Sequence, residues 1–422
     1  MVDSTKPTSP RLAKLYDALV AGTRAALQGF WQTIAEQGTP LIESLPDDTA
    51  HILLTLLWRA TEPVATVAII GYLADAIDGV AVGSNHMCCL LDTDLWYKTY
   101  RVRKDLRTMY QLAPNDPLIP DAAPQDWAAR RANWRPDPFN PRTFTLPPHD
   151  RDPARPMQVW SLIELPDAPP QPWIVPQPSI PSGAVAVAYF YSHILGNERR
   201  LWVYSPPTVH TIDASAGLLL VFDGWIYRSV VPTPTILDNL YAANQTSPLV
   251  AVLIDHPDDQ TRNIELACSP SFTAFLADEL VPWLRQHYHL SHDPAQMIVA
   301  GSSYGGLAAS FAALSRPDVF GKVLAQSGSF AWSPADDPEA EWVARRVALG
   351  PLLPIEWYLE VGLLEYAPDV PYTPLVANRH LRTVLQARGY QVRYREFTGG
   401  HEYLTWRGTF ADGLIALAGR RS

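Results

Sequence analysis

The chain has 422 residues, of which 47% are hydrophobic and 18% charged, so it is long enough for two domains or for one large enzyme with an appended module. Its net charge of −10 and the lack of a basic stripe argue against nucleic acid or an anionic membrane surface as the partner. The three cysteines include an adjacent pair, Cys88 and Cys89, which cannot readily bridge each other, so no disulfide framework is expected.

The N-terminal region, residues 1–45, is predicted to be a helical extension. Apolar residues recur at helical spacing through 11–37, which indicates an amphipathic helix packed on the body of the protein. Its polar face mixes acidic, basic and amide residues, which disfavours a helix lying on a membrane. No apolar signal segment precedes it, and no run of about 18 apolar residues follows, so a cytoplasmic location is expected.

A small antiparallel β-sandwich is predicted next, as a domain over residues 46–165. Short strands separated by turn signals are expected at 51–58, 65–72, 95–102 and 108–112. This region is rich in aromatic residues, which either form a ligand platform or belong to the core, and the core is the commoner place for them. They are Trp58, Trp96, Tyr97, Tyr100 and Tyr110.

Proline is unusually frequent, with 40 residues against an ordinary frequency of ~5%. Much of it lies between 113 and 182, which predicts an extended segment that wraps from one domain to the next. We assign 166–183 as the linker proper.

Residues 184–422 are predicted to form a doubly wound, mostly parallel α/β domain. An opening hairpin is expected at 184–191 and 200–204, and the continuous apolar runs at 218–222 and 249–254 are typical of strands buried on both faces. Helical patterns then alternate with strands, as in an α/β sheet. They lie near 271–289, 304–315, 376–388 and 408–419.

The stretch Gly301-Ser302-Ser303-Tyr304-Gly305 has the strand–turn–helix context of a nucleophile elbow, with Ser303 at its centre. The flanking glycines suggest that the strand and helix backbones approach closely, so that a Cβ at 301 or 305 would collide. The competing interpretation is a Gly-Ser turn that only caps a helix.

Two later residues favour the elbow over that alternative. Glu365 follows a strand-like segment at 355–361, and His401 follows another at 391–397, which gives the chain order serine, acid, histidine of α/β-hydrolases. Asp369 is a rival for the acid. The other histidine cluster, around 287–292, lacks cysteine or carboxylate neighbours and is interpreted as surface, so no metal site is expected.

Two backbone amides are candidates for an oxyanion hole. Tyr304 begins the helix after the elbow, where first-turn amides have no intrahelical partner. Trp225 follows the apolar run that ends in Asp223-Gly224, at the edge of the sheet where the second amide is needed. An ordinary Asp-Gly turn is the alternative.

The sequence resembles the enterochelin (enterobactin) esterase family over most of its length. The resemblance implies an immunoglobulin-like N-terminal domain, a hydrolase domain without a cofactor, and cytoplasmic hydrolysis of the trilactone of a ferric catecholate siderophore. Departures near Ser302 and after Asp223-Gly224 leave the siderophore backbone open. The matching stretches are residues 56–59, 137–141, 164–172, 222–224, 261–266, 300–307, 326–329, 362–365 and 399–408.

An anionic substrate requires cations focused against the net charge of the protein. Arg262, Arg228 and Arg407 follow expected strand ends or the catalytic histidine, and Arg262 is the first choice. Its alternative role is a local ion pair with Glu265. Two other functions remain open, a feruloyl or acetyl esterase of carbohydrates with a sugar-binding module, and a non-catalytic binding protein.

Overall fold

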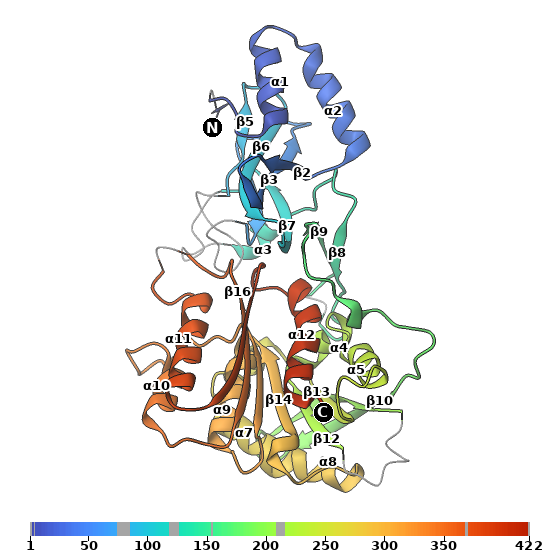
Figure 1. Ribbon diagram of the computed structural model, residues 1–422, viewed down its shortest axis with the longest axis vertical. Coiled ribbons are helices and arrows are strands. Elements are labelled where there is room, and N and C mark those ends of the chain that lie inside the picture. The colour runs from blue at the N-terminus through green and yellow to red at the C-terminus, as the bar shows by residue number, and fades with distance from the viewer. Residues whose placement is uncertain are drawn as a thin grey trace. The chain divides into compact units, whose positions relative to one another are not determined.

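In the computed structural model, the chain folds into two compact units, each with its own hydrophobic core (Figure 1). The first unit comprises Met1–Pro169 together with two short loops from further along the chain, Leu364–Pro368 and Thr398–Leu404. The second comprises Pro170–Leu363, Asp369–Phe397 and Thr405–Ser422. The structure describes residues 2–3, 5–73, 85–117, 126–152, 155–207, 216–367 and 370–420.

The first unit contains two sheets among its described residues, with strand orders β1-β5-β6-β3-β2 and β4-β7-β9-β8. Neighbouring strands are antiparallel except β1 and β5. One core combines side chains of β3 and β6 with side chains of β4 and β7, which confirms a β-sandwich. The strands are β1 (Val2–Asp3), β2 (Leu41–Leu45), β3 (Asp48–Arg59), β4 (Val67–Gly71), β5 (Cys88–Leu90), β6 (Leu95–Arg103), β7 (Arg107–Pro114), β8 (Thr143–Leu146) and β9 (Gln158–Glu164).

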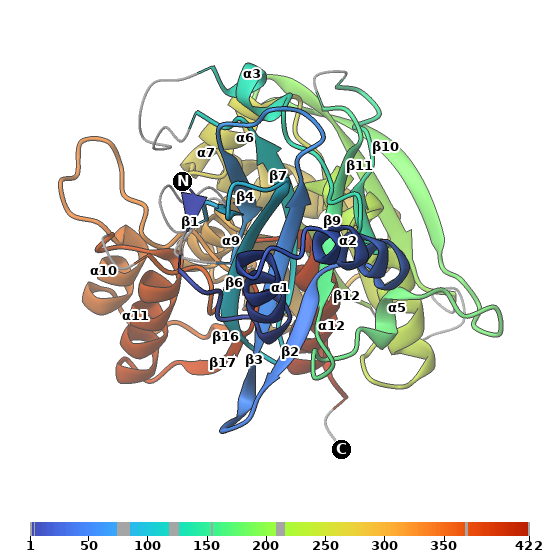
Figure 2. The same cartoon turned by 90° about the horizontal axis from the view of Figure 1, so that it is seen from above.

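The N-terminal helical segment is two helices instead of the single one expected, α1 (Pro10–Val20) and α2 (Ala25–Gln37). The break falls at Gly22, whose φ of 85° is a left-handed conformation that ends a helix. Both helices pack on the outer face of the first sheet (Figure 2), where Leu12 and Ile34 share a buried cluster with Leu57. Strand β3 is therefore buried on both faces, with six consecutive buried residues at 52–57.

The aromatic residues of this unit are mostly core. Trp96, Tyr97, Tyr100 and Tyr110 are buried, as the commoner interpretation expected. Trp58 is only partly buried, and the guanidinium of Arg135 lies over its ring, 5.8 Å from the centroid.

The proline-rich segment is more structured than a connector. It supplies a short helix, α3 (Trp127–Arg131), and the strands β8 and β9, which complete the second sheet of the sandwich. The prediction of an extended segment is therefore wrong for β8 and β9. Strand β9 pairs with β7, and its Ile163 is buried in the core of the sandwich. Beyond Pro169 the chain enters the second unit, where Pro172–Ile174 forms a single 3₁₀ turn.

The second unit is built on one sheet with the order β10-β11-β13-β12-β14-β15-β16-β17 in its described residues. The strands from β13 onward are parallel to one another, whereas β10 and β11 form the predicted antiparallel hairpin. The strands are β10 (Ala184–Ser192), β11 (Asn197–Ser205), β12 (Gly217–Val221), β13 (Leu249–Ile254), β14 (Met297–Ser302), β15 (Lys322–Gln326), β16 (Glu356–Gly362) and β17 (Gln391–Phe397).

Helices cover both faces of this sheet, which confirms the doubly wound fold (Figure 1). One group packs on the face that carries Leu220 and Val299. Its members are α7 (Pro270–Ala274), a π-helical turn (Phe275–Leu280), α8 (Val281–His287), α9 (Tyr304–Ser315), α10 (Trp342–Leu349) and α11 (Pro374–Ala387). The opposite face is covered by α4 (Gly224–Ser229), α5 (Thr233–Ala242) and α12 (Tyr403–Ala418).

The short helix α6 (Asp259–Glu265) follows β13. In the described residues, no helix has the length and the apolar character that a membrane crossing requires.

Candidate active site

Ser303 occupies a strained turn between β14 and α9. Its φ of 54° and ψ of −121° lie outside the regions that residues with a side chain ordinarily adopt. Its amide donates to the carbonyl of Gln326 at 3.0 Å, and the amide of Ser329 donates to the Ser303 carbonyl at 3.0 Å. The end of β15 and the loop after it therefore hold the strained residue from both sides, as expected for a nucleophile elbow.

The two glycines of the elbow differ in what they allow. A Cβ on Gly301 would lie 2.7 Å from backbone atoms of Gly305, so only glycine fits there. A Cβ on Gly305 would meet its nearest atoms at 3.6 Å, which is ordinary contact. The prediction that a Cβ at 305 would collide is therefore wrong. The close contact between the strand and helix backbones lies at the Cβ position of residue 301 and not at that of residue 305.

Glu365 and His401 form a hydrogen-bonded pair within the first unit. Nδ1 of His401 lies 2.7 Å from Oε2 of Glu365, whose side chain is fully buried, whereas the imidazole is 21% exposed. A second bond, from the amide of Leu364 to the carbonyl of Gly399, ties the two loops together. The rival acid, Asp369, lies outside the described residues.

The strands that precede the predicted catalytic residues are parallel and adjacent or nearly so in the sheet. Ser303 follows β14, Glu365 follows β16 and His401 follows β17. Parallel strands end at a common edge, and ligands of open α/β sheets bind outside that carboxyl edge. Each of the three residues thus follows the end of a parallel strand in the chain, as the sequence predicted.

The Asp-Gly turn after β12 is also strained and tightly packed. Asp223 adopts a left-handed conformation with a φ of 57° and is the residue directly before α4. A Cβ on Gly224 would lie 2.7 Å from the backbone of Ile254, so the turn presses against β13. Trp225 is thus the second residue of α4, in the first turn of a helix that follows the end of β12, where the sequence placed the second oxyanion-hole candidate.

Arg262 pairs with Asp223 and not with Glu265, so the local ion pair considered as its alternative role is wrong. Nη2 of Arg262 donates to Asp223 Oδ2 at 2.8 Å, and Nε forms a second bond to the same carboxylate. Glu265 is instead held by the buried Arg199 at 2.8 Å, and Nδ1 of His256 lies 3.2 Å from it. These contacts, together with burial that acts in the opposite sense, give Glu265 a pKa of about 2.

Comparison with known proteins agrees with this architecture. A family model described as the N-terminal domain of enterochelin esterase matches residues 53–174, and one described as a putative esterase matches 192–417. The iron(III) enterobactin esterase of Dickeya dadantii is 30% identical over 431 aligned residues, which cover 94% of each chain. The chain belongs to the enterochelin esterase family. It is a carboxylic ester hydrolase.

Two further relatives extend this result. The iron(III) salmochelin esterase of Escherichia coli is 26% identical and covers 97% of this chain and 98% of its own. The crystal structure of the ferric enterobactin esterase from Salmonella typhimurium superposes with a TM-score of 0.72 at 27% identity, covering 92% of this chain and 98% of that one. The similarity to the enterochelin esterase family therefore includes both units.

The other two candidate arginines of this enterochelin esterase family member lie on helices of the second unit. Arg228 is exposed on α4, close to the Asp-Gly turn in the sequence. Arg407 lies in the first turns of α12, and its Nε donates to Oε1 of Gln171 at 3.0 Å. Arg407 thus also fixes the chain just after it enters the second unit.

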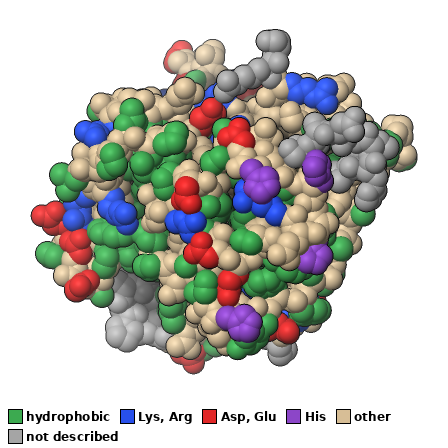
Figure 3. Space-filling view, turned by 90° about the horizontal axis from the view of Figure 1, so that it is seen from below, with side chains coloured by type: hydrophobic (Ala, Val, Ile, Leu, Met, Phe, Trp, Pro, Cys, Tyr) green, Lys and Arg blue, Asp and Glu red, His purple; other side chains and the backbone are tan. Residues whose placement is uncertain are grey.

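The histidines at 287–292 lie at the surface, as predicted. His287 is in the last turn of α8, and His289 and His292 are also exposed. Histidines are visible at the surface on the face drawn in Figure 3. No group of potential metal ligands occurs among the described residues.

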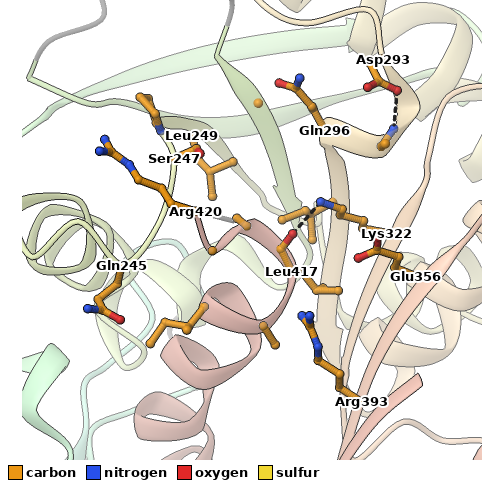
Figure 4. Close-up of a pocket in the computed structure, with 18 of the residues that line it drawn as sticks. Gln245, Ser247, Leu249, Asp293, Gln296, Lys322, Glu356, Arg393, Leu417 and Arg420 are labelled. Atoms are coloured by element: carbon orange, nitrogen blue, oxygen red, sulfur yellow. Dashed lines mark hydrogen bonds between the residues drawn. The ribbon is translucent and has the colours of Figure 1, made fainter. Parts of the chain in front are cut away.

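A cavity of about 970 Å³ lies at the opposite edge of the sheet (Figure 4). It is bordered by the first residues of several strands, among them Gly217, Leu249 and Lys322, and by the end of α12. The amino group of Lys322 donates to the carbonyl of Leu417 at 2.6 Å. Because the elbow lies at the carboxyl ends of the strands, we assign this cavity no part in ester hydrolysis.

Sequence reasoning missed a buried polar network behind the elbow. Glu360, in the middle of β16, accepts hydrogen bonds from Gln326 at 2.7 Å, from Thr409 at 2.5 Å and from Tyr358 at 3.0 Å. Burial raises the pKa of Glu360 to about 7, although these bonds favour the charged form. A Glu between the apolar residues Leu359 and Val361 of a predicted strand was the signal that could have revealed it.

Proposed function

We propose that this enzyme hydrolyses the lactone ester bonds of a ferric catecholate siderophore of the enterobactin type in the cytoplasm, and so releases iron for reduction. The observation that carries the proposal is the match to iron(III) enterobactin esterase over 94% of both chains. Cys88, Cys89 and Cys268 form no disulfide in the described part of the chain, which agrees with a reduced compartment. The ferric ion belongs to the substrate, and the proposed reaction uses no cofactor.

In the proposed mechanism, Ser303 is the nucleophile, His401 the general base and Glu365 the orienting acid. The Glu365 carboxylate accepts from Nδ1–H of His401 and orients the imidazole, and in the proposed reaction Nε2 takes the proton from the Ser303 hydroxyl. Oγ of Ser303 then bonds to the ester carbonyl carbon, and the proton passes from His401 to the leaving alcohol. Water, deprotonated by His401, releases the acyl group in the second half of the reaction.

During the reaction a negative charge develops on the carbonyl oxygen of the ester. We assign its stabilisation to hydrogen bonds from the backbone amides of Tyr304 and Trp225. Tyr304 begins α9 directly after Ser303, where an amide has no partner within its helix. Trp225 lies in the first turn of α4, after the turn that presses against β13. The tight packing of both turns supports the assignment, because an oxyanion hole works by holding its donors in place before the charge appears.

A panel of siderophores tests the reaction and identifies the backbone. Ferric enterobactin, a glucosylated analogue and a threonine-based trilactone would be incubated with the enzyme, and the linear products would be measured by mass spectrometry. Ser303→Ala and His401→Ala should each lower turnover by several orders of magnitude while the fold and substrate binding persist, because nucleophile and base act as a unit. Turnover of a feruloyl sugar ester but of no siderophore would overturn the proposal in favour of a carbohydrate esterase.

Arg262, Arg228 and Arg407 are proposed to attract the anionic substrate. The side chain of Arg262 is 22% exposed, so it can present charge to a ligand while it holds Asp223. We expect Arg262→Ala to weaken binding of the ferric siderophore about 10- to 100-fold, with a smaller salt dependence, because a charge-assisted contact is lost.

Arg393→Ala is the matched control for this experiment, since Arg393 is exposed beside the cavity at the opposite edge of the sheet and the same charge is removed. A small neutral ester separates the two roles of Arg262. Equal losses on the neutral ester and on the siderophore would show that Arg262 acts only by holding the Asp-Gly turn.

A further inference from the structure

Ser329 has a hydroxyl in contact with the predicted nucleophile. Its Oγ lies 3.1 Å from Oγ of Ser303, and either hydroxyl can be the donor. Its backbone is also engaged, since the Ser329 amide donates to the Ser303 carbonyl at 3.0 Å. One residue of the loop after β15 thus binds both the main chain and the side chain of Ser303.

The loop that carries Ser329 is fixed from several sides. The amide of Ser327 donates to the carbonyl of Glu360 at 2.7 Å, and Nδ2 of Asn378 donates to the carbonyl of Gly328 at 2.8 Å. Nε1 of Trp406 donates to Oγ of Ser327 at 3.1 Å. Strand β16 and the helices α11 and α12 therefore hold the loop, and its hydroxyl is positioned before any substrate arrives.

We propose that Ser329 is a further catalytic residue, whose hydroxyl donates a hydrogen bond to Oγ of Ser303 and stabilises the negative charge that develops there. The proposal rests on Ser303 being the nucleophile. When Ser303 gives its proton to His401, its oxygen can only accept, so the Ser329 O–H points at it. A hydrogen bond to a charged oxygen is about twice as strong as a neutral one, and the added strength appears only during the reaction.

The same contact serves both halves of the reaction. During attack, the bond from Ser303 Oγ to the acyl carbon forms, and Ser329 keeps its own proton throughout. In the acyl-enzyme, Oγ is an ester oxygen and a poor acceptor, so the contact weakens. When water attacks, the bond between Oγ and the acyl carbon breaks, and Ser329 again stabilises the oxygen as charge returns to it.

The test compares Ser329→Ala with Ser329→Thr on a small neutral aryl ester. We expect Ser329→Ala to lower kcat roughly 10- to 100-fold with little change in KM, because the lost bond forms fully only in the transition state. Ser329→Thr retains a hydroxyl and should recover most of the rate. Labelling of Ser303 by a fluorophosphonate should slow in the alanine variant in parallel with kcat.

Ser310→Ala is the matched control, since its buried hydroxyl bonds within α9 to the carbonyl of Gly306. Its kcat should stay close to that of the unaltered enzyme. The proposal is overturned if Ser329→Ala hydrolyses the ester as fast as or faster than the unaltered enzyme, which would mean that the contact holds the nucleophile in a resting position. It is also overturned if the threonine and alanine variants lose activity equally together with a lowered Tm.

The ester hydrolysis and labelling measurements do not depend on whether the natural substrate is a siderophore. A neutral ester and a fluorophosphonate report on Ser303 whatever the natural substrate is. If Ser303→Ala retained hydrolysis, the triad would fail, whereas a failure of the Ser329 proposal alone would leave the Ser303 result intact.

Discussion

Replacing Glu360 by glutamine should stabilise the protein, and the gain should depend on pH. Glu360 is fully buried in β16, and burial raises its pKa from an ordinary 4.5 to about 7. The folded protein therefore holds a proton here up to about pH 7, whereas the unfolded chain releases it near pH 4.5. Between these values the folded state binds more protons than the unfolded state, so stability falls as pH rises.

The size of the effect follows from the difference between the two pKa values. At about 1.36 kcal/mol per pKa unit, the ionised side chain costs about 3 kcal/mol of the free energy of unfolding above pH 7. Glutamine removes this cost and keeps the shape of the side chain. It can still accept from Gln326 and Thr409, and its amide can donate to the Tyr358 hydroxyl.

Urea unfolding at pH 4.5 and pH 8 measures this difference. We expect Glu360→Gln to match the unaltered protein at pH 4.5 and to exceed it by about 3 kcal/mol at pH 8, which corresponds to a Tm higher by about 6–12 °C. Glu198→Gln is the control, because Glu198 is exposed on β11. The reasoning is refuted if the two proteins differ by the same amount at both pH values, or if Glu360→Gln is the less stable at pH 8.

Two further predictions concern the triad acid and the elbow. Glu365→Gln should slow hydrolysis less than Ser303→Ala does, since an orienting acid contributes less than the nucleophile; if Asp369→Asn is the more damaging change in the same kinetic assay, the acid is Asp369. Gly301→Ala should lower the free energy of unfolding by about 1–3 kcal/mol, because its Cβ collides with backbone, whereas Gly305→Ala should unfold at nearly the same urea concentration as the unaltered protein.

The local sequence pattern was sufficient to predict the class of fold and the strand–turn–helix context of Ser303. Continuous apolar runs such as 218–222 and 249–254 are buried parallel strands, because a strand covered on both faces has no polar side. The elbow could be recognised since its strain requires particular residues at particular positions, and Ser303 does have a positive φ. The sequence also predicted that Glu365 and His401 follow strand ends, because the lengths of the strand-like segments before them indicated where β16 and β17 end.

Contacts between segments far apart in the chain could not be predicted from local sequence pattern. The helical spacing of Arg262 and Glu265 allowed a local ion pair as one alternative, yet Arg262 binds Asp223, because the loops after β12 and β13 meet where neighbouring parallel strands end. The hydroxyl of Ser329 meets Ser303 for the same reason, since β15 pairs with β14. Spacing along one segment says nothing about such partners.

Burial was the other property that only the tertiary structure decided. Glu360 is one acidic residue in a strand, and its raised pKa arises from the helices that cover β16 and exclude water. The single helix expected at 11–37 is divided at Gly22 so that both halves can lie on one sheet. The sequence by itself determined which chemistry the chain can perform, because that depends on residue types and local strain. The tertiary structure decided which groups are in contact and which are shielded from water, because both depend on the packing of segments far apart in the chain.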